Sequence, residues 1–288
     1  MKVIEVLNQT MQCLKEHSVD NPRLDAELLL GKSMGLSRED LYIHLHSRVK
    51  KAEREALGDL IRRRISGEPL QYISGHQEFW SVDFKVDPHV LIPRPETELL
   101  VEETLSILSA RPFTTAPLVL ELGTGSGAIA ISLAREVKDI FVVATDISTE
   151  ALLLARENAL RADVLRKIAF LNGDLFGPIR NLGDKGPFDV ILSNPPYIAR
   201  PEIGRLPREV KSEPVIALDG GEDGLSFYRR IVSRAPSYLQ RGGWLLLEIG
   251  QGQGFEVSHL IGEGGAFLEP QLLPDLAGID RIVKAQKR

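Results

Sequence analysis

The carboxyl-terminal part of the chain predicts an α/β fold, a doubly wound and mostly parallel sheet. From residue 117 onward, short apolar segments of strand length alternate with segments of helical periodicity. A glycine-rich turn follows the first of these strands and opens a helix. We expect strands at 118–122, 140–145, 168–171, 188–193 and 244–249, and helices at 128–137, 149–160 and 225–239.

The end of the chain departs from this alternation. Two further strands, 267–273 and 281–285, have no predicted helix between them. Parallel strands need a long crossover, whereas antiparallel strands can be joined by a short turn. The sequence therefore predicts a C-terminal antiparallel hairpin at one edge of the sheet.

The first 70 residues predict a small N-terminal helical bundle, because their apolar residues recur at helical spacing. The first helix begins near Val3. Asn21-Pro22 starts a second, since proline suits the first helical turn. Ser37 is expected to cap a third helix, and the charged segment 50–65 forms a fourth with one apolar face.

Residues 71–95 predict a β-hairpin linker. Tyr72-Ile73, Phe79-Trp80 and residues 82–86 alternate as short strands do, and Asp87-Pro88 supplies a turn. The expected domains are the helical domain at 1–70, the linker at 71–95 and the α/β domain at 96–288.

Composition narrows the class of protein. The 288 residues carry a net charge of −5, which argues against stable nucleic-acid binding. We find no apolar stretch long enough for a membrane span and no signal-peptide core near the N-terminus. The one cysteine, Cys13, excludes an internal disulfide and a cysteine-based zinc site, and the scattered histidines indicate no metal site. We expect a cytoplasmic protein without a membrane partner.

The segment from Glu121 to Ala128 predicts a cofactor site. It reads Glu-Leu-Gly-Thr-Gly-Ser-Gly-Ala, a strand end followed by a glycine loop and a helix start. Glycines let the backbone turn sharply and approach a ligand closely. The loop also fits the loose dinucleotide pattern, so a dehydrogenase stays an alternative, although no later His or Lys stands out as a hydride-transfer acid. The expected cofactor-binding residues of this loop are Gly123, Thr124, Gly125, Ser126 and Gly127.

Two carboxylates close the next strands. Asp146 follows the glycine loop by about 20 residues, where an acid accepts hydrogen bonds from ribose hydroxyls. Asp174 closes the third strand and could meet an exocyclic adenine amine, while Leu175 offers apolar packing. The alternative for each acid is a helix N-cap.

The tetrapeptide Asn194-Pro195-Pro196-Tyr197 ends the strand predicted at 188–193. Two prolines cannot continue a strand, because each lacks a ladder N–H and has a fixed φ. The resulting turn presents an amide side chain, free backbone carbonyls and an aromatic ring, which together can grip a planar –NH₂ group. An ordinary Pro-Pro turn would have the same sequence, so the motif alone leaves both interpretations open.

Taken together, the glycine loop, Asp146, Asp174 and the Asn-Pro-Pro-Tyr turn resemble class I S-adenosylmethionine-dependent methyltransferases. The resemblance to the HemK/PrmC family extends over most of the chain. The further segments that carry it are residues 72–75, 92–98, 213–214, 219–225 and 248–250. It implies the class I methyltransferase fold, S-adenosylmethionine as cofactor, and methylation of the glutamine in the Gly-Gly-Gln motif of class I peptide chain release factors.

The resemblance and the local chemistry together suggest roles for the turn. The Asn194 side-chain oxygen and the Pro195 carbonyl would accept the two hydrogens of the substrate amide, and Tyr197 would pack against its plane. Asn194, Pro195 and Tyr197 are thus the expected catalytic residues. Pro196 completes the substrate site, and Asn194 is also expected to contact the cofactor. Residues 93–96 would line the substrate mouth. The alternative is a turn that starts a helix, and it is the favoured interpretation for Arg94.

Several alternatives remain open at this point. The same motifs suit a ribosomal-protein glutamine methyltransferase or a nucleic-acid amino methyltransferase that acts on a flipped base. A non-catalytic binding protein on this fold is a further alternative. The N-terminal bundle is expected to dock a protein substrate. Its Arg62-Arg63-Arg64 run is either a solvated helix face or a contact for a release factor or RNA.

Overall fold

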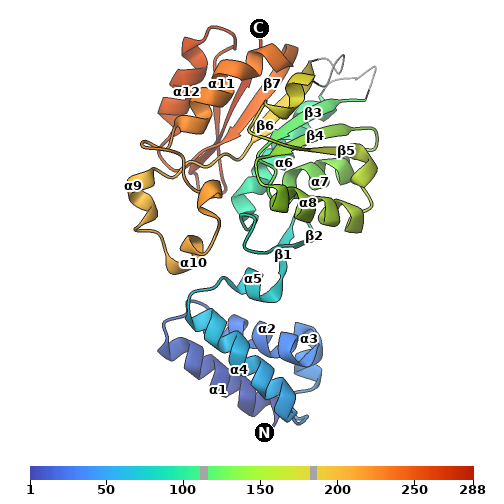
Figure 1. The fold of residues 1–288 in the computed structure, drawn as a ribbon, viewed down its shortest axis with the longest axis vertical. Helices are drawn as coiled ribbons and strands as arrows, with labels where there is room; N and C mark the ends of the chain where they lie inside the picture. Colours follow the sequence, from blue (N-terminus) through green and yellow to red (C-terminus); the bar gives the residue numbers. More distant parts are fainter. Residues whose placement is uncertain (111–115, 182–186) are drawn as a thin grey trace. The chain divides into compact units, whose positions relative to one another are not determined.

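The computed structural model describes residues 1–110, 116–181 and 187–288, and the chain divides into two compact units (Figure 1). One unit comprises Met1–His76 together with Pro207–Ser212. The other comprises Gln77–Leu206 and Glu213–Arg288. Each unit has a hydrophobic core of its own, as expected of separate domains.

The N-terminal unit is helical. Its helices are α1 (Val3–Glu16), α2 (Pro22–Met34), α3 (Arg38–Ile43), α4 (Lys51–Ile65), α5 (Leu70–Ser74) and, from later in the chain, α10 (Arg208–Lys211). Leu14, Leu29 and Leu30 are buried at its centre. Ser37 caps α3 as predicted, because its hydroxyl accepts a 3.1 Å hydrogen bond from the Asp40 N–H. The four helices predicted for this region are confirmed.

The prediction of a strand at Tyr72-Ile73 is wrong. Both residues lie in α5, one helical turn that ends at Gly75, where φ is +84°. The Tyr72 and Ile73 side chains are both buried. A pair of adjacent apolar residues can be buried from a short helix as well as from a strand, and periodicity cannot distinguish the two over so short a segment.

The positive charges of the Arg62-Arg63-Arg64 run in α4 are paired with carboxylates. The Arg64 side chain is 6% exposed and bonds Asp25 and Glu209, each at 2.6 Å. Arg63 pairs with Glu68 at 2.5 Å, and Arg62 pairs with Asp59 on its own helix. Each of the three guanidiniums thus has an acidic partner, and contact of this run with a release factor or RNA stays an open alternative.

The second unit contains a seven-stranded sheet in the order β5-β4-β3-β6-β7-β9-β8. Strands β3 to β7 pair in parallel, and β9 pairs antiparallel with both β7 and β8. The doubly wound sheet with a terminal antiparallel hairpin is therefore as predicted. The strands are β3 (Leu118–Leu122), β4 (Phe141–Asp146), β5 (Ile168–Asn172), β6 (Phe188–Ser193), β7 (Leu239–Glu248), β8 (Gln271–Pro274) and β9 (Asp280–Gln286).

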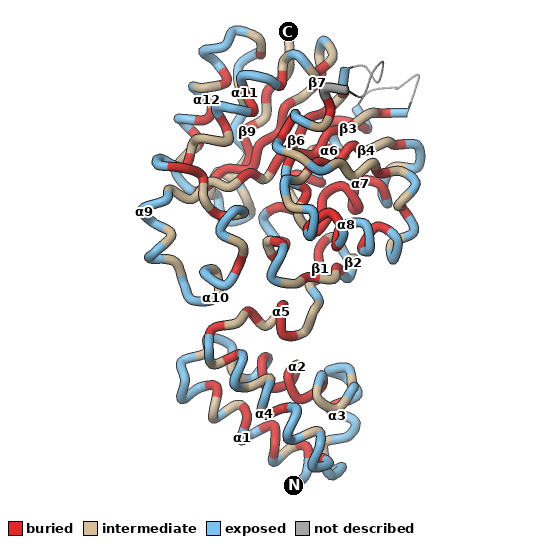
Figure 2. Tube along the Cα trace, viewed as in Figure 1, coloured by how far each residue is buried: buried red, intermediate tan, exposed pale blue. Residues whose placement is uncertain are grey.

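Helices cover both faces of this sheet (Figures 1 and 2). Successive residues of the central strands face opposite sides: Val119 packs with the core beneath α6, α7 and α8, whereas Leu120 packs with the core beneath α11 and α12. The helices of this unit are α6 (Glu98–Ser109), α7 (Ala128–Glu136), α8 (Thr149–Arg161), α9 (Arg200–Ile203), α11 (Ser226–Tyr238) and α12 (Gly254–Glu263).

Shorter elements complete the chain. Strands β1 (His76–Phe79) and β2 (Val82–Lys85) form a two-stranded sheet, so that part of the predicted hairpin is present. Single 3₁₀ turns are η1 (Pro95–Thr97), η2 (Leu165–Lys167), η3 (Pro178–Asn181) and η4 (Val215–Ala217). In the described part of the chain, no helix has the length and apolar character needed to cross a bilayer.

Two strands begin several residues away from the predicted positions, and one helix of ten residues is absent from the prediction. Strand β7 begins at Leu239 rather than at residue 244, because a register shift against β6 absorbs the Gly242-Gly243 interruption. Strand β8 begins at Gln271 rather than at residue 267, since Pro270 cannot donate to a ladder. Helix α12 was not predicted. It starts at Gly254 after a glycine-rich segment, and glycine has low helix propensity.

Candidate active site

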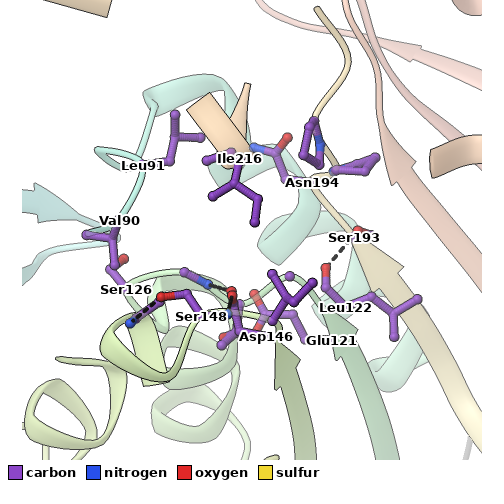
Figure 3. A pocket seen from close by; sticks show the side chains of 18 of the residues that line it. Val90, Leu91, Glu121, Leu122, Ser126, Asp146, Ser148, Ser193, Asn194 and Ile216 are labelled. Carbon is purple, nitrogen blue, oxygen red and sulfur yellow. Dashed lines mark hydrogen bonds between the residues drawn. The ribbon is translucent and has the colours of Figure 1, made fainter. Parts of the chain in front are cut away.

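A cavity of about 360 Å³ opens at the carboxyl ends of β3, β4, β5 and β6 (Figure 3). This is the edge at which the strand order reverses, the usual ligand site of a doubly wound sheet. Figure 3 shows Leu91, Ile216 and Asn194 along one wall, facing Glu121, Ser126 and Asp146 on the other.

The glycine loop forms one wall of the cavity. Gly123 and Gly125 have φ of +75° and +55°, a left-handed conformation that favours glycine. A Cβ built on either residue would meet nothing within 4 Å, so the loop backbone faces open space. Thr124 and Ser126 also line the cavity. The backbone is thus free to approach a ligand closely.

Gly127 has a different role from its two neighbours. It is not among the residues that line the cavity, although the sequence placed it in the cofactor site. A Cβ there would lie 2.9 Å from Ile131 Cδ1 and 3.1 Å from Ala155 Cβ. Gly127 therefore lets α7 and α8 pack closely at the start of α7.

Asp146 ties the glycine loop to the end of β4. Its two carboxylate oxygens accept hydrogen bonds from the Gly125 N–H at 2.8 Å and from the Ser148 N–H at 2.9 Å. Burial raises the pKa of this carboxyl above its usual value. The N-cap of α8 is Ser148, whose hydroxyl accepts from the Ala151 N–H, so the capping alternative for Asp146 does not hold.

Glu121 is a buried acid at the end of β3 that the sequence analysis left without a role. It is 1% exposed, lines the cavity, and accepts hydrogen bonds from the Thr124 hydroxyl and the Ala130 N–H. Burial raises its pKa to about 8, so near neutral pH much of this carboxyl is protonated. Glu121 thus supports the glycine loop through its bonds to Thr124 and Ala130, and Asp146 supports it through its bond to Gly125.

Asp174 lies at the cavity edge with an unpredicted partner. Its carboxylate pairs with the guanidinium of Arg230 from α11, which also lies 5.5 Å from the centre of the Phe227 ring. Leu175 lines the cavity in a left-handed conformation, with φ of +48°. Contact between Asp174 and an adenine amine stays a prediction, and the carboxylate would have to be shared with Arg230. Only tertiary structure brings α11 to this edge.

The Asn-Pro-Pro-Tyr turn forms the opposite wall. Asn194, Pro195 and Pro196 line the cavity, whereas Tyr197 is not among the lining residues. The Asn194 Nδ2 donates to Thr97 Oγ1 at 3.1 Å, and Thr97 Oγ1 donates to Glu248 Oε2 at 2.7 Å. Neither Thr97 nor Glu248 received a role from the sequence, because neither is near Asn194 along the chain.

Tyr197 packs behind the turn. A Cβ built on Gly250 would lie 3.0 Å from its ring, and its backbone carbonyl accepts from Gln253 Nε2 at 3.0 Å. Burial raises the pKa of its phenol to about 12, so the hydroxyl is neutral under ordinary conditions. A contact between Tyr197 and a substrate amide stays a prediction.

The segment 89–97 closes a third side. Of residues 93–96, predicted at the substrate mouth, Pro93 and Arg94 line the cavity, whereas Pro95 and Glu96 are not among the lining residues. Thr97 also lines it. Glu213, whose side chain is 1% exposed, accepts a 3.0 Å hydrogen bond from the Ile92 N–H and pairs with the Arg94 guanidinium. The buried Glu213 carboxylate thus joins the segment around Ile92 and Arg94 to a part of the chain about 120 residues further on.

The loop at 219–224 supports the turn from outside. The Gly220 N–H donates to the Ile198 carbonyl at 2.8 Å. A Cβ on Gly220 would lie 2.8 Å from the Tyr197 backbone, and one on Gly224 would lie 2.4 Å from its carbonyl oxygen. Both positions therefore require glycine. The sequence had placed this segment near the site without a defined role.

Comparison with known proteins decides the family. One family model, the PrmC N-terminal domain, matches residues 5–75, and another, the methyltransferase small domain, matches residues 97–205. The release factor glutamine methyltransferase of Moorella thermoacetica is 43% identical over 288 residues, covering 100% of this chain and 99% of that protein. This chain belongs to the release factor glutamine methyltransferase family. The Geobacter sulfurreducens relative of the same name is 44% identical, covering 97% of this chain and 94% of that protein.

Solved structures agree with the fold. The hMettl16 catalytic domain in complex with MAT2A 3′UTR hairpin 1 aligns with a TM-score of 0.59 at 12% identity, covering 98% of this chain and 90% of that one. A methyltransferase from Pyrococcus furiosus aligns with a TM-score of 0.50 at 20% identity, covering 72% of this chain and 89% of that one. At such identities the likeness shows the fold alone.

Family membership confirms the predicted class I methyltransferase fold, the methyltransferase activity and S-adenosylmethionine as methyl donor. The cavity fits such a donor. Its volume of about 360 Å³ is within the range of ligand pockets. The glycine backbone, the carboxylates of Asp146 and Asp174, and the apolar Leu175 provide the close approach, the acceptors and the packing surface that a nucleoside needs.

Proposed function

We propose that this enzyme methylates the side-chain amide nitrogen of the glutamine in the Gly-Gly-Gln motif of class I peptide chain release factors. The observation that carries the proposal is the position of Asn194, Pro195 and Pro196 on the cavity wall opposite the glycine loop. An amide held by that wall would face the methyl donor. The full-length similarity to proteins named release factor glutamine methyltransferase supports a glutamine as the acceptor.

The difficulty of the reaction lies in the nucleophile. An amide nitrogen attacks poorly because its lone pair is delocalised into the carbonyl. Bound S-adenosylmethionine supplies a strongly electrophilic methyl group, whose bond to sulfur breaks as the new bond to nitrogen forms, with sulfur keeping the electron pair. The protein therefore has to position the nitrogen and localise its lone pair, and positioning alone can supply several kcal/mol, roughly 7–11 in favourable cases.

Asn194 and Pro195 can perform that task. We assign the Asn194 side-chain oxygen and the Pro195 carbonyl as acceptors for the two hydrogens of the substrate –NH₂. Pro195 lies beyond the end of β6, so its carbonyl is outside the sheet ladder. Two acceptors on one side would favour a pyramidal nitrogen that points its lone pair at the methyl group. The nitrogen loses its proton to water after transfer, so no general base is assigned.

We assign the donor site to the opposite wall. Cavity-lining residues that could contact S-adenosylmethionine there are Gly123, Thr124, Gly125, Ser126, Asp146, Asp174 and Leu175, and Asn194 could contact it from the Asn-Pro-Pro-Tyr wall. Gly127 would act indirectly, through the packing of α7. The N-terminal unit, matched by a family model of its own, is proposed to dock the release factor. Such a reaction would take place in the cytoplasm, where release factors act.

The experiment offers the purified enzyme S-adenosylmethionine carrying a labelled methyl group together with release factors, ribosomal proteins and RNA. We expect label on the Gly-Gly-Gln glutamine, located by mass spectrometry of the tryptic peptide. The matched control is a release factor in which that glutamine is replaced by glutamate, which has no –NH₂ and should take no label. Label confined to RNA or to a ribosomal protein would contradict the proposal.

A further inference from the structure

Three side chains from distant parts of the chain meet behind the Asn-Pro-Pro-Tyr turn. Thr97 ends η1, Asn194 follows β6, and Glu248 ends β7. Thr97 and Glu248 are 5% and 3% exposed. The Asn194 Nδ2 donates to Thr97 Oγ1 at 3.1 Å, and Thr97 Oγ1 donates to Glu248 Oε2 at 2.7 Å. Asn194 also helps to lower the pKa of Glu248.

The order of donors and acceptors in this network is determined by chemistry. An ionised carboxylate only accepts, so the Thr97 hydroxyl must give its one proton to Glu248. The Thr97 oxygen then presents lone pairs, which attract a donor. The Asn194 –NH₂ group supplies that donor. A flipped amide would place its oxygen against the Thr97 oxygen and lose this bond.

The same order decides what Asn194 offers to a substrate. In a planar amide the oxygen and the nitrogen lie on opposite sides of the carbonyl carbon. With Nδ2 donating to Thr97, Oδ1 faces away from that bond and is left as an acceptor on the residue that lines the cavity. The Thr97 hydroxyl donates in turn to Glu248, and this chain of hydrogen bonds polarises the amide, which makes Oδ1 a stronger acceptor.

We propose that Thr97 and Glu248 are positioning residues that lock the amide of Asn194 with its oxygen toward the substrate –NH₂. The inference rests on the proposed methylation of an amide nitrogen, which requires an acceptor at that place. A flipped Asn194 would present a donor to the substrate –NH₂ and repel it. Thr97 bonds Asn194 directly and Glu248 bonds Thr97, so both act through Asn194.

The charge state of Glu248 makes the orientation of the Asn194 amide sensitive to pH. Burial raises the pKa of Glu248 to about 7, opposed by the hydrogen bond from Thr97 and the charge of Arg281 on β9, while Glu96 in η1 raises it further. The phenols of Tyr197 and Tyr228 also face it, and the Tyr228 hydroxyl donates to the Glu248 backbone carbonyl at 2.9 Å. A protonated Glu248 can donate to Thr97 and release the amide. The kcat/KM for release factor should therefore rise with pH through the neutral region.

The first test removes the Thr97 hydroxyl, which joins Asn194 to Glu248. Thr97→Val should lower kcat about a hundredfold, while the Kd for S-adenosylmethionine, measured by calorimetry, stays within about twofold. Thr97→Ser keeps the hydroxyl and should recover most of kcat. The matched control is Thr104→Val, which removes another buried threonine hydroxyl, one that bonds the Leu100 carbonyl and is not among the cavity-lining residues. If Thr104→Val lowers kcat as much as Thr97→Val does, the effect is structural and the proposal fails.

The second test replaces Glu248 by glutamine. Glu248→Gln should lower kcat at high pH and abolish the rise of kcat/KM that Glu248 causes through neutral pH, since residue 248 no longer carries a carboxyl. An unchanged profile in Glu248→Gln would assign the titration to another group and overturn the role of Glu248. Thermal unfolding of each variant checks that the fold survives.

A third measurement separates this inference from the proposed function. In ¹⁵N-labelled enzyme, the side-chain –NH₂ signals of Asn194 are assigned by their loss in Asn194→Asp. We expect the hydrogen that Asn194 donates to Thr97 to exchange slowly with solvent, and to exchange faster in Thr97→Val. If the wild-type enzyme fails to methylate release factors while these signals behave as expected, the proposed substrate is wrong, but the proposed orientation of the Asn194 amide is supported. Equal exchange in the wild type and Thr97→Val would refute the lock whatever the substrate.

Discussion

The two walls of the cavity are built in different ways. The glycine-loop wall is supported by hydrogen bonds between residues 3, 9 and 21 positions apart, from Thr124 to Glu121, Ala130 to Glu121 and Gly125 to Asp146. The Asn-Pro-Pro-Tyr wall is supported by bonds that span 97, 151 and 56 positions, through Thr97, Glu248 and Gln253.

The two walls are therefore expected to serve different steps, binding of the methyl donor and positioning of the methyl acceptor. The donor wall consists largely of backbone, so its shape depends on glycine conformations that neighbouring residues can specify. The acceptor wall consists of a turn whose side chain must be aimed, and the groups that aim it come from η1, β7 and the segment after β7. We therefore expect changes on the first wall to alter donor affinity, and changes on the second to alter turnover.

The largest effect is expected at Asn194. Asn194→Ala removes the acceptor that would be used in the transition state, so kcat should fall by about 10²–10³-fold, as for loss of other transition-state hydrogen bonds. The Kd for S-adenosylmethionine should change little. Single-turnover kinetics and calorimetry measure the two quantities separately. Near-normal turnover would show that the Asn-Pro-Pro-Tyr wall does not hold the nucleophile.

The complementary change on the other wall is Asp146→Ala. It removes the acceptor of the Gly125 N–H and a proposed partner of the ribose, so the donor Kd should rise about ten- to a hundredfold, the equivalent of a hydrogen bond to a charged group. At saturating donor, kcat should stay near the wild-type value. Asp146→Asn keeps one acceptor oxygen and should show a smaller loss. A fall in kcat with unchanged donor affinity would remove the distinction between the walls.

A pair of glycines tests how far the acceptor wall depends on remote packing. Gly224 and Gly278 have nearly equal φ of +76° and +78°, so alanine costs each position about 1–2 kcal/mol of backbone strain. Only Gly224 has a close neighbour, the Tyr197 carbonyl oxygen, 2.4 Å from a built Cβ, whereas Gly278 has nothing within 4 Å. Gly224→Ala should lower both Tm and kcat, and Gly278→Ala should lower Tm slightly and leave kcat unchanged. Equal kinetics in the two variants would contradict a supporting role for the loop.

The smallest effect is expected at the Asp174–Arg230 pair. Both side chains are about half exposed, at 49% and 46%, so the pair contributes little, about 0.2–1 kcal/mol. Arg230→Met frees the Asp174 carboxylate and should tighten donor binding by no more than a few-fold, an effect that added salt reduces. Calorimetry at two salt concentrations measures it. Donor binding weakened tenfold would instead make Arg230 a cofactor ligand.

Much of the fold could be predicted from periodicity alone. Strand β3 was predicted with its observed limits, and so was β6, because each is an apolar run bounded by a turn signal. The short elements were harder to predict from the sequence. Tyr72-Ile73 became a helical turn and α12 was not foreseen, since over a few residues, or in glycine-rich sequence, local preference is too weak to decide between states.

The sequence by itself determined the sheet, the glycine loop and the Asn-Pro-Pro-Tyr turn, because each depends on backbone preferences of adjacent residues. Tertiary structure alone decided that Gly127 packs helices rather than lining the cavity, that Arg230 meets Asp174, and that Thr97 and Glu248 stand behind Asn194. The physical reason is the range of the interactions. Turn conformation is set by φ and by missing N–H groups within a few residues, whereas the orientation of one amide depends on donors and acceptors that only the folded sheet brings together.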